Sequence, residues 1–157
     1  MEIVRANEKD LEAIHQVVSI TIEDTYKVCG QKIVDFFHMI HSEKNILRDI
    51  RECSTYKIME EGRCVGTGCV KGNHLTRLYI LPEYQGRGFG KVMMDLMEQE
   101  VAEHYDEAFL DPSESAIAFY EKRGYSIVSH EDCQLDEGVV LPHDVMKKDL
   151  TGFRKDA

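Results

Sequence analysis

The chain has 157 residues, of which 43% are hydrophobic and 31% charged, and its formal net charge is −10. This size predicts one domain, over residues 1–157, whose core needs no metal or cross-link, and the acidic excess disfavours nucleic acid and anionic membranes as partners. No apolar stretch reaches the roughly 20 residues of a membrane-spanning helix, and the polar N-terminus lacks a signal-peptide pattern, so we expect a cytoplasmic protein.

The first third of the chain is expected to form a short strand followed by helices. Residues 3–4 begin the strand, Asn7 can cap the first helix, and a second helical pattern follows Gly30. Residues 46–50 either extend this second helix or form a further turn. The apolar positions at helical spacing are Leu11, Ile14, Val18 and Ile22 in the first helix and Ile33, Phe36, Phe37 and Ile40 in the second.

The middle of the chain changes to the short apolar segments that are typical of β-strands. Segments 56–60, 63–70 and 74–81 are separated by glycine-containing turns, which predicts a three-stranded meander. Pro82 closes the third strand, because proline has no N–H group to donate to a sheet.

Helices and strands then alternate to the end of the chain. The expected elements are a helix over residues 88–104, a strand over 107–111, a helix over 114–123 and strands over 125–135 and 143–150. In the first of these helices we expect burial of Val92, Met93, Leu96, Met97 and Val101 and exposure of Asp95, Glu98 and Glu103. The alternation implies a parallel pair of strands at the centre of an otherwise antiparallel sheet, and therefore a mixed α/β fold.

Three glycines, Gly86, Gly88 and Gly90, lie between the third meander strand and the following helix, with Arg87 and Lys91 among them. A helix N-terminus presents unpaired backbone N–H groups and the positive end of the helix dipole, and together these bind anions. Glycine also removes the Cβ atoms that would hold a phosphate away from those amides. The junction is therefore a candidate phosphate site, although glycines alone are also compatible with a simple turn.

Two widespread nucleotide-binding motifs do not fit this loop. The dinucleotide fingerprint G-x-G-x-x-G needs glycine at position 91, and the Walker A motif needs glycine at position 85 and serine or threonine at position 92. The loop instead contains the pattern Q-x-x-G-x-G, from Gln85 to Gly90. This pattern resembles the pyrophosphate-binding motif of GNAT-type acyl-CoA-dependent acetyltransferases.

A second stretch, residues 111–128, resembles another CoA-binding element of that family, a strand followed by a helix with the run A-x-x-F-Y-x-K-x-G-aromatic. The matching residues are Ala116, Phe119, Tyr120, Lys122, Gly124 and Tyr125. The order of elements also fits, down to the closing strand at residues 146–150, so the resemblance covers essentially the whole chain. It implies a mixed, mostly antiparallel sheet of about six to seven strands with a splayed parallel pair, flanked by about four helices.

The resemblance implies transfer of an acetyl group from acetyl-CoA to an amine of a small molecule or peptide, by direct attack in a ternary complex and without a metal. Tyr120 would protonate or hydrogen-bond the sulfur of CoA, and backbone N–H groups of residues 78–80 would bind the pantetheine arm and the thioester carbonyl. Ser113 stands where many family members carry asparagine, and its side chain reaches less far. The expected cofactor-binding residues are Leu78, Tyr79, Ile80, Gln85, Gly86, Arg87, Gly88, Phe89, Gly90, Lys91, Ser113, Ala116, Phe119, Tyr120 and Lys122.

An amine acceptor needs a base, because a primary amine with a pKa near roughly 10 is almost fully protonated at pH 7. His74 is the first candidate for this catalytic role and Glu83 the second, although His74 can also be an ordinary strand-edge residue. The acidic chain would attract a cationic acceptor, or its charge serves only solubility. The resemblance places acceptor binding in the first two helices and the last two strands, where the polar candidates are Glu23, Asp24, Tyr26, His38, His41, Asp136 and Glu137.

Two other functions remain open at this stage. One is a non-catalytic acyl-CoA-binding sensor on the same fold, and the other is a nucleotide-binding domain of a different class, which would bind ATP or NAD more tightly than CoA. Homodimers are common in the family that the chain resembles, so a homodimer is a further expectation.

The cysteines lack any CxxC pair, which argues against a disulfide framework and a zinc site. We expect them to be reduced and buried, with none in a setting that would favour a covalent enzyme intermediate. They are Cys29, Cys53, Cys64, Cys69 and Cys133.

Overall fold

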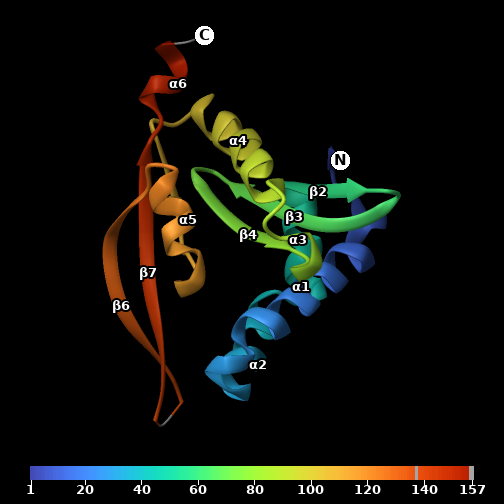
Figure 1. Cartoon of the computed structure of the whole chain (residues 1–157), viewed down its shortest axis with the longest axis vertical. Helices are drawn as coiled ribbons and strands as arrows, with labels where there is room; N and C mark the ends of the chain where they lie inside the picture. The colour runs from blue at the N-terminus through green and yellow to red at the C-terminus, as the bar shows by residue number, and fades with distance from the viewer. Residues whose placement is uncertain (137, 156–157) are drawn as a thin grey trace.

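The computed structural model describes residues 1–136 and 138–155. A seven-stranded sheet has the order β1-β2-β3-β4-β5-β7-β6, with β4 and β5 parallel and the other neighbours antiparallel (Figure 1). The strands are β1 (Glu2–Arg5), β2 (Ser54–Glu60), β3 (Arg63–Lys71), β4 (His74–Ile80), β5 (Glu107–Leu110), β6 (Ser126–Asp136) and β7 (Val139–Asp149). The predicted fold class, a mostly antiparallel sheet with one parallel pair, is therefore confirmed.

Helices pack on this sheet and on one another. They are α1 (Leu11–Tyr26), α2 (Gln31–Ile40), α3 (Glu43–Glu52), α4 (Phe89–Ala102), α5 (Ile117–Lys122) and α6 (Thr151–Lys155). The main core cluster joins the sheet to α4. Position 68 of β3 needs glycine, because Met93 and Met97 of α4 lie where a side chain would begin. A second core cluster forms where α1, α2 and α3 meet.

The first helices begin much as their sequence predicts. Asn7 forms a capping box with Asp10 at a single 3-10 turn that leads into α1. Residues 46–50, for which two alternatives were open, lie in the separate helix α3, whose first turn is capped by the hydroxyl of Ser42. The buried residues Ile14, Val18, Ile22, Val34, Ile46 and Ile50 hold these three helices together.

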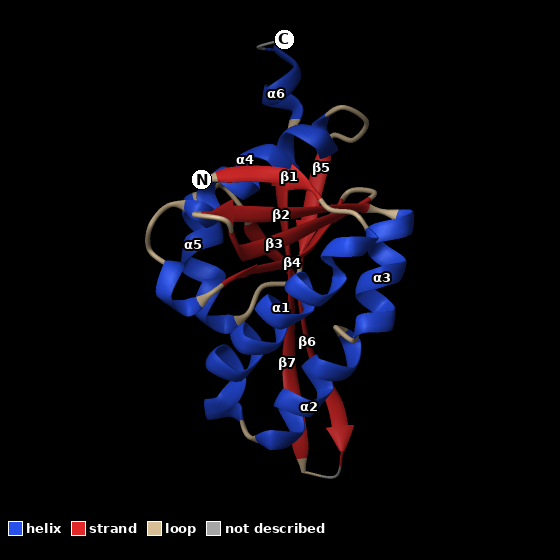
Figure 2. Ribbon diagram, turned by 90° about the vertical axis from the view of Figure 1, so that its right-hand side faces the viewer, coloured by secondary structure: helices blue, strands red, loops and turns tan. Residues whose placement is uncertain are grey.

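The β6–β7 hairpin is longer than the sequence patterns predict, because β7 begins at Val139 and not at residue 143. Pro142 lies inside the strand, where it pairs with Asp132 of β6. The short strand β5 pairs with β7 only from Met146 onward, so Pro142 lies where β7 has no neighbour on that side and its missing N–H group costs no sheet hydrogen bond. In Figure 2 the hairpin runs away from β1 to β4 toward the end of the molecule at which α2 lies.

One face of α4 differs from the prediction. Glu98, expected to be exposed, is only 1% exposed, whereas Val92, expected to be buried, is 38% exposed. Glu98 is buried because α5 and β7 cover that side of the helix and supply Arg123 and Lys148 as ion-pair partners. The expected exposure of Asp95 and Glu103 is confirmed.

The cysteines are all free thiols, but their burial differs from the prediction. Cys69 is buried in the inner strand β3, whereas Cys29 and Cys133 are exposed, so the expectation of buried thiols was wrong for those two. Cys133 is exposed because it lies on β6, the edge strand of the sheet. Within the described residues, no helix combines the length and the apolarity needed to span a membrane.

Candidate active site

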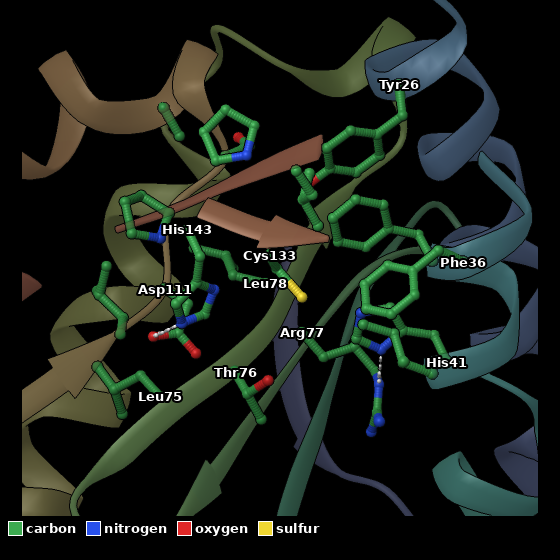
Figure 3. Close-up of a pocket in the computed structure, with 18 of the residues that line it drawn as sticks. Tyr26, Phe36, His41, Leu75, Thr76, Arg77, Leu78, Asp111, Cys133 and His143 are labelled. Atoms are coloured by element: carbon green, nitrogen blue, oxygen red, sulfur yellow. Dashed lines mark hydrogen bonds and ion pairs between the residues drawn. The ribbon is translucent and has the colours of Figure 1, made fainter. Parts of the chain in front are cut away.

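A cavity of about 700 Å³ lies between α1 and α2 on one side and the β6–β7 hairpin on the other, with β4 along its floor (Figure 3). It exists because the parallel pair splays. Strands β4 and β5 pair at His74 with Phe109 and at Leu75 with Leu110, and the rest of β4 continues without β5 to Ile80. The backbone of β4 beyond Leu75 therefore lines an opening and not a continuous sheet.

A bulge in β4 adds to this opening. The register between β3 and β4 shifts between Thr67 and Cys69, and Arg77 has a φ of 54°, which is uncommon for a residue other than glycine. The Arg77 side chain is buried, where Nη1 donates to Asp49 Oδ2 at 2.9 Å and Nε donates to His41 Nδ1 at 3.0 Å. These contacts stabilise a backbone conformation that the local sequence would not favour.

Two of the three β4 residues expected to bind through their main chain, Leu78 and Tyr79, line the cavity, and Ile80 does not. The carbonyl group of Ile80 accepts a hydrogen bond from Nε2 of Gln85 at 2.9 Å. Gln85 of the glycine loop therefore ties that loop to the end of β4.

Tyr120 of α5 lines the cavity and is 8% exposed. Its ring packs edge-on against Phe119 at 5.1 Å and Tyr125 at 5.7 Å between centroids. Burial is the main cause that raises the pKa of Tyr120 well above its ordinary value. Its hydroxyl group has no hydrogen-bond partner among the described residues and is not sealed from solvent, so it is a protonated donor available to a ligand.

His74 also lines the cavity, and it is joined there by two residues that the sequence analysis did not single out. His74 Nε2 lies 3.1 Å from Asp111 Oδ2, and His143 Nε2 lies 3.8 Å from Asp111 Oδ1. Figure 3 shows His143 and Asp111 on the same side of the cavity. Burial alone would raise the pKa of Asp111, but the hydrogen bond from His74 and the charges of both imidazoles lower it. Asp111 is therefore an ionised carboxylate between two imidazoles.

The second candidate base, Glu83, is exposed and pairs with Arg63 at 3.2 Å, outside the cavity. No group of three or more His, Cys, Asp or Glu side chains within the described residues is arranged to hold a metal ion. Of the two candidate bases, His74 is thus the one that lines the same cavity as Tyr120.

The glycine loop precedes α4 and lies outside the cavity lining. Gly86 and Gly88 have φ angles of 76° and 86°, and a Cβ atom at either would meet no other atom within 4 Å. Gly88 is the N-cap of α4, with no side-chain cap, so the helix N-terminus opens onto free space. Phe119 lies 3.7 Å from the Cβ position of Gly90, so the loop and the cavity meet at α5.

The charged residues of the loop have partners on the surface. Arg87 lies over the ring of Tyr84 at 5.0 Å from its centroid, and Lys91 pairs with Asp95 at 3.2 Å. Both cations are exposed at the helix N-terminus, where they add positive potential. The loop is therefore open and carries positive charge, as a site for an anion would require.

The remaining cofactor candidates divide among three locations. Ser113 and Ala116 line the cavity, Phe89 is buried in the main core cluster, and Lys122 is exposed on α5.

The acceptor candidates also divide. Tyr26 and His41 line the cavity, and burial is the main cause that lowers the pKa of His41 to about 3. The other described candidates lie on the surface, where Glu23 pairs with His38 at 2.9 Å, Asp136 pairs with Lys32 at 2.6 Å and Asp24 is exposed. Glu137 lies outside the described residues.

A sequence family described as "Acetyltransferase (GNAT) domain" matches residues 24–150. Among curated relatives, N-alpha-acetyltransferase 20 of Dictyostelium discoideum is 30% identical over 101 residues, which are 57% of this chain and 58% of that protein. The chain spans about half the length of the curated relatives it matches.

Solved structures share the fold across nearly the whole chain. A GCN5-related N-acetyltransferase from Rhodopseudomonas palustris has a TM-score of 0.83 at 22% identity, with 94% of each chain covered. The PaiA N-acetyltransferase from Thermoplasma acidophilum, in complex with coenzyme A, has a TM-score of 0.76 at 21% identity, with 94% of this chain and 98% of that chain covered. The match to the sequence family over most of the chain, on this fold, shows that the protein belongs to the GNAT acetyltransferase family.

Proposed function

We propose that the protein transfers an acetyl group from acetyl-CoA to an amine by direct attack in a ternary complex. The observation that carries the proposal is the Tyr120 hydroxyl, a protonated donor that has no hydrogen-bond partner among the described residues and lines the cavity opened by the splay of β4 and β5. Membership of the GNAT family supports acetyl transfer, and the related Thermoplasma structure was solved in complex with coenzyme A.

The donor would bind along two features that meet at α5. Backbone N–H groups at the start of α4, unobstructed at Gly86 and Gly88, would bind the pyrophosphate, and Arg87 and Lys91 would add positive charge. The pantetheine arm would follow the unpaired edge of β4 into the cavity. Backbone N–H groups of residues 78–79 would then stabilise negative charge on the thioester carbonyl oxygen.

In the reaction the amine nitrogen attacks the carbonyl carbon, so that a C–N bond forms and the C–S bond breaks. His74 takes the proton that the amine loses, and Asp111, 3.1 Å from His74 Nε2, holds the imidazole in place. The thiolate of CoA leaves, and the proton from His74 returns to it through solvent.

Tyr120 would act on the leaving sulfur. A free tyrosine is already a weaker acid than a thiol, with pKa values of about 10 against about 8.5, and burial raises the pKa of Tyr120 further. Complete proton transfer to sulfur is therefore uphill. Tyr120 would instead donate a hydrogen bond that strengthens as charge develops on sulfur.

The experiment combines calorimetry with acetyl-CoA and detection of released thiol across a panel of amines. Binding of acetyl-CoA together with thiol release that depends on an amine supports the proposal. Binding without turnover on any amine would favour a non-catalytic sensor. Tighter binding of ATP or NAD than of CoA would favour a nucleotide-binding domain of another class.

A further inference from the structure

The cavity has two chemically different walls (Figure 3). Helices α1 and α2 contribute Tyr26, Phe36 and His41 on one side, and Asp111 and His143 lie across from them. One wall is thus mainly aromatic, and the other carries negative charge. The acceptor that fits the cavity must satisfy both.

The aromatic wall is an ordered stack of rings. Tyr26 and Phe37 stack with their centroids 3.8 Å apart and their planes 11° from parallel. Phe36 meets Phe37 edge-on at 5.5 Å, and Ile40 extends this surface by one helical turn. The wall therefore offers a flat apolar surface with which another ring can stack or make edge contacts.

Core packing does not account for this whole wall. Tyr26 and Phe37 pack against the cluster formed by α1, α2 and α3, but Phe36 and Ile40 belong to neither core cluster of the described residues. Both are half-buried and line the cavity. Large apolar side chains that face an open cavity without packing on the core are typical of a binding surface for an apolar group.

The opposite wall is acidic. Asp111 is ionised. Glu131 of β6 lies opposite His143 of β7 in the register of the hairpin, so the side chains of Glu131 and His143 point to the same face of the sheet, and both residues line the cavity. A carboxylate wall favours an ammonium group on the acceptor and repels a phosphate or carboxylate group.

Among the described residues, the cavity lining offers no free lysine or arginine that could offset this acidity. Arg77 is the one lysine or arginine of the lining in the part of the chain that the structure describes, and its guanidinium is engaged by Asp49 and His41. His41 is uncharged at neutral pH, because its pKa is lowered to about 3. An acceptor with a phosphate or carboxylate group would therefore find no free lysine or arginine in the described lining, and the imidazoles of His74 and His143 both contact Asp111.

The volume adds a limit on size. The cavity holds about 700 Å³, and part of it must accommodate the pantetheine arm and the acetyl group. Sites of about 300 to 1,000 Å³ are typical for small molecules. We propose that the acceptor is a small primary amine that carries a flat apolar group, chemically an arylalkylamine, with its ring against Phe36 and its ammonium group toward Asp111 and Glu131. This inference rests on the proposed acetyl transfer.

The test measures kcat/KM of the full chain with saturating acetyl-CoA for 2-phenylethylamine, tryptamine, putrescine, phenylalanine, glucosamine 6-phosphate and a peptide with a free N-terminus. The two arylalkylamines should exceed each other acceptor by at least about tenfold, since they alone combine a ring with an isolated ammonium group. Phenylalanine is the matched probe for 2-phenylethylamine, because it differs by one carboxylate.

A pair of variants on α2 links the preference to the aromatic wall. Phe36→Ala should raise KM for 2-phenylethylamine about tenfold and leave KM for acetyl-CoA unchanged, whereas Met39→Ala should change neither. Met39 is 63% exposed on the same helix and lies outside the cavity lining. Unchanged melting temperatures and an unchanged KM for acetyl-CoA would exclude a loss of folding as the cause. Phe36→Leu should raise KM for 2-phenylethylamine by an intermediate amount.

The outcomes separate the two proposals. Acetyl transfer with equal or better use of putrescine, phenylalanine, the phosphorylated sugar or the peptide would overturn the arylalkylamine inference and leave acetyl transfer intact. The same holds for an unchanged KM in Phe36→Ala. Absence of transfer to every acceptor would overturn the proposed function itself, and the inference with it.

Discussion

The carboxylate of Glu98 accepts a hydrogen bond from the hydroxyl of Tyr125 at 2.9 Å, inside the protein. Glu98 Oε1 also pairs with Arg123 and Lys148, each at 2.9 Å. Because the ring of Tyr125 packs edge-on against Tyr120, this cluster connects α4 to the residue that we propose acts on the CoA sulfur. An acidic residue in the middle of α4 thus fixes the position of α5.

Replacing Glu98 with alanine should destabilise the protein strongly. The change would leave Arg123 and Lys148 without their shared buried carboxylate, and loss of one partner from a buried pair costs about 3 to 5 kcal/mol. Urea unfolding of Glu98→Ala measures the loss. Glu103→Ala, an exposed position just after α4, is the matched control and should change the unfolding free energy by less than about 0.5 kcal/mol. Equal stabilities of the two variants would contradict the assignment.

Tyr120→Phe should lower kcat about 100-fold, because it removes the hydroxyl that we propose donates a hydrogen bond to the leaving sulfur. The dissociation constant of CoA, measured by calorimetry, should hardly change, since the ring and its packing remain. Tyr105→Phe removes a hydroxyl from an exposed tyrosine and should leave kcat intact. Unchanged turnover in Tyr120→Phe would remove this residue from the mechanism.

Gly88→Val should abolish detectable CoA binding. Valine would place its side chain in the open space at the start of α4, and the φ of 86° at Gly88 adds backbone strain. Gly62→Val is a control for the strain alone, because Gly62 has a φ of 76° and equally open surroundings in the β2–β3 turn. CoA titration of both variants separates a blocked ligand site from a strained turn, and full affinity in Gly88→Val would refute the loop assignment.

His74→Ala should lower kcat by at least about 100-fold, the range expected for loss of a general base. His143→Ala is the informative comparison, because His143 contacts the same carboxylate from the hairpin at 3.8 Å. Steady-state measurement of kcat with one amine shows which of the two variants loses more activity. A larger loss in His143→Ala than in His74→Ala would move the role of base to His143.

His41 should make stability depend on pH above the range where carboxylates titrate. Folding lowers the pKa of His41 from 6.5 to about 3, mainly through burial and then through Arg77, with smaller contributions from His38 and Lys71, whereas the charge of Asp49 acts in the opposite direction. Below pH 6.5 the unfolded chain therefore binds a proton that the folded protein does not, and stability decreases as pH decreases. Between pH 6.5 and pH 5 this contribution amounts to about 1.5 kcal/mol.

Urea unfolding at a series of pH values tests this expectation. In His41→Asn the free energy of unfolding should change less between pH 6.5 and pH 5 than in the wild type, and the difference should equal the contribution of His41. The reason is that asparagine can still accept the hydrogen bond from Arg77 but does not titrate. His104→Asn, at an exposed position after α4, should keep the full dependence. An identical slope in wild type and His41→Asn would show that His41 is not kept neutral by folding.

Local patterns in the sequence determined the order of elements, the central parallel pair and the position of the glycine loop before α4. Each of these depends on neighbouring residues, because side-chain periodicity, proline at a strand end and glycine at a helix start act over a few positions. The resemblance of two sequence motifs to the GNAT family pointed to Tyr120, the need for a base on the strand before the glycine loop pointed to His74, and both residues line the cavity.

The tertiary structure alone decided which polar groups meet. Nothing near Glu98 in the sequence indicates that Arg123 and Lys148 will cover it, and helical periodicity therefore predicted exposure. His143 joins Asp111 only because β7 extends past β5 beside the cavity. The aromatic wall forms because the helix connection brings Phe37 onto Tyr26. Such contacts join segments far apart in the chain, so their energies depend on packing and charge pairing that no local pattern encodes.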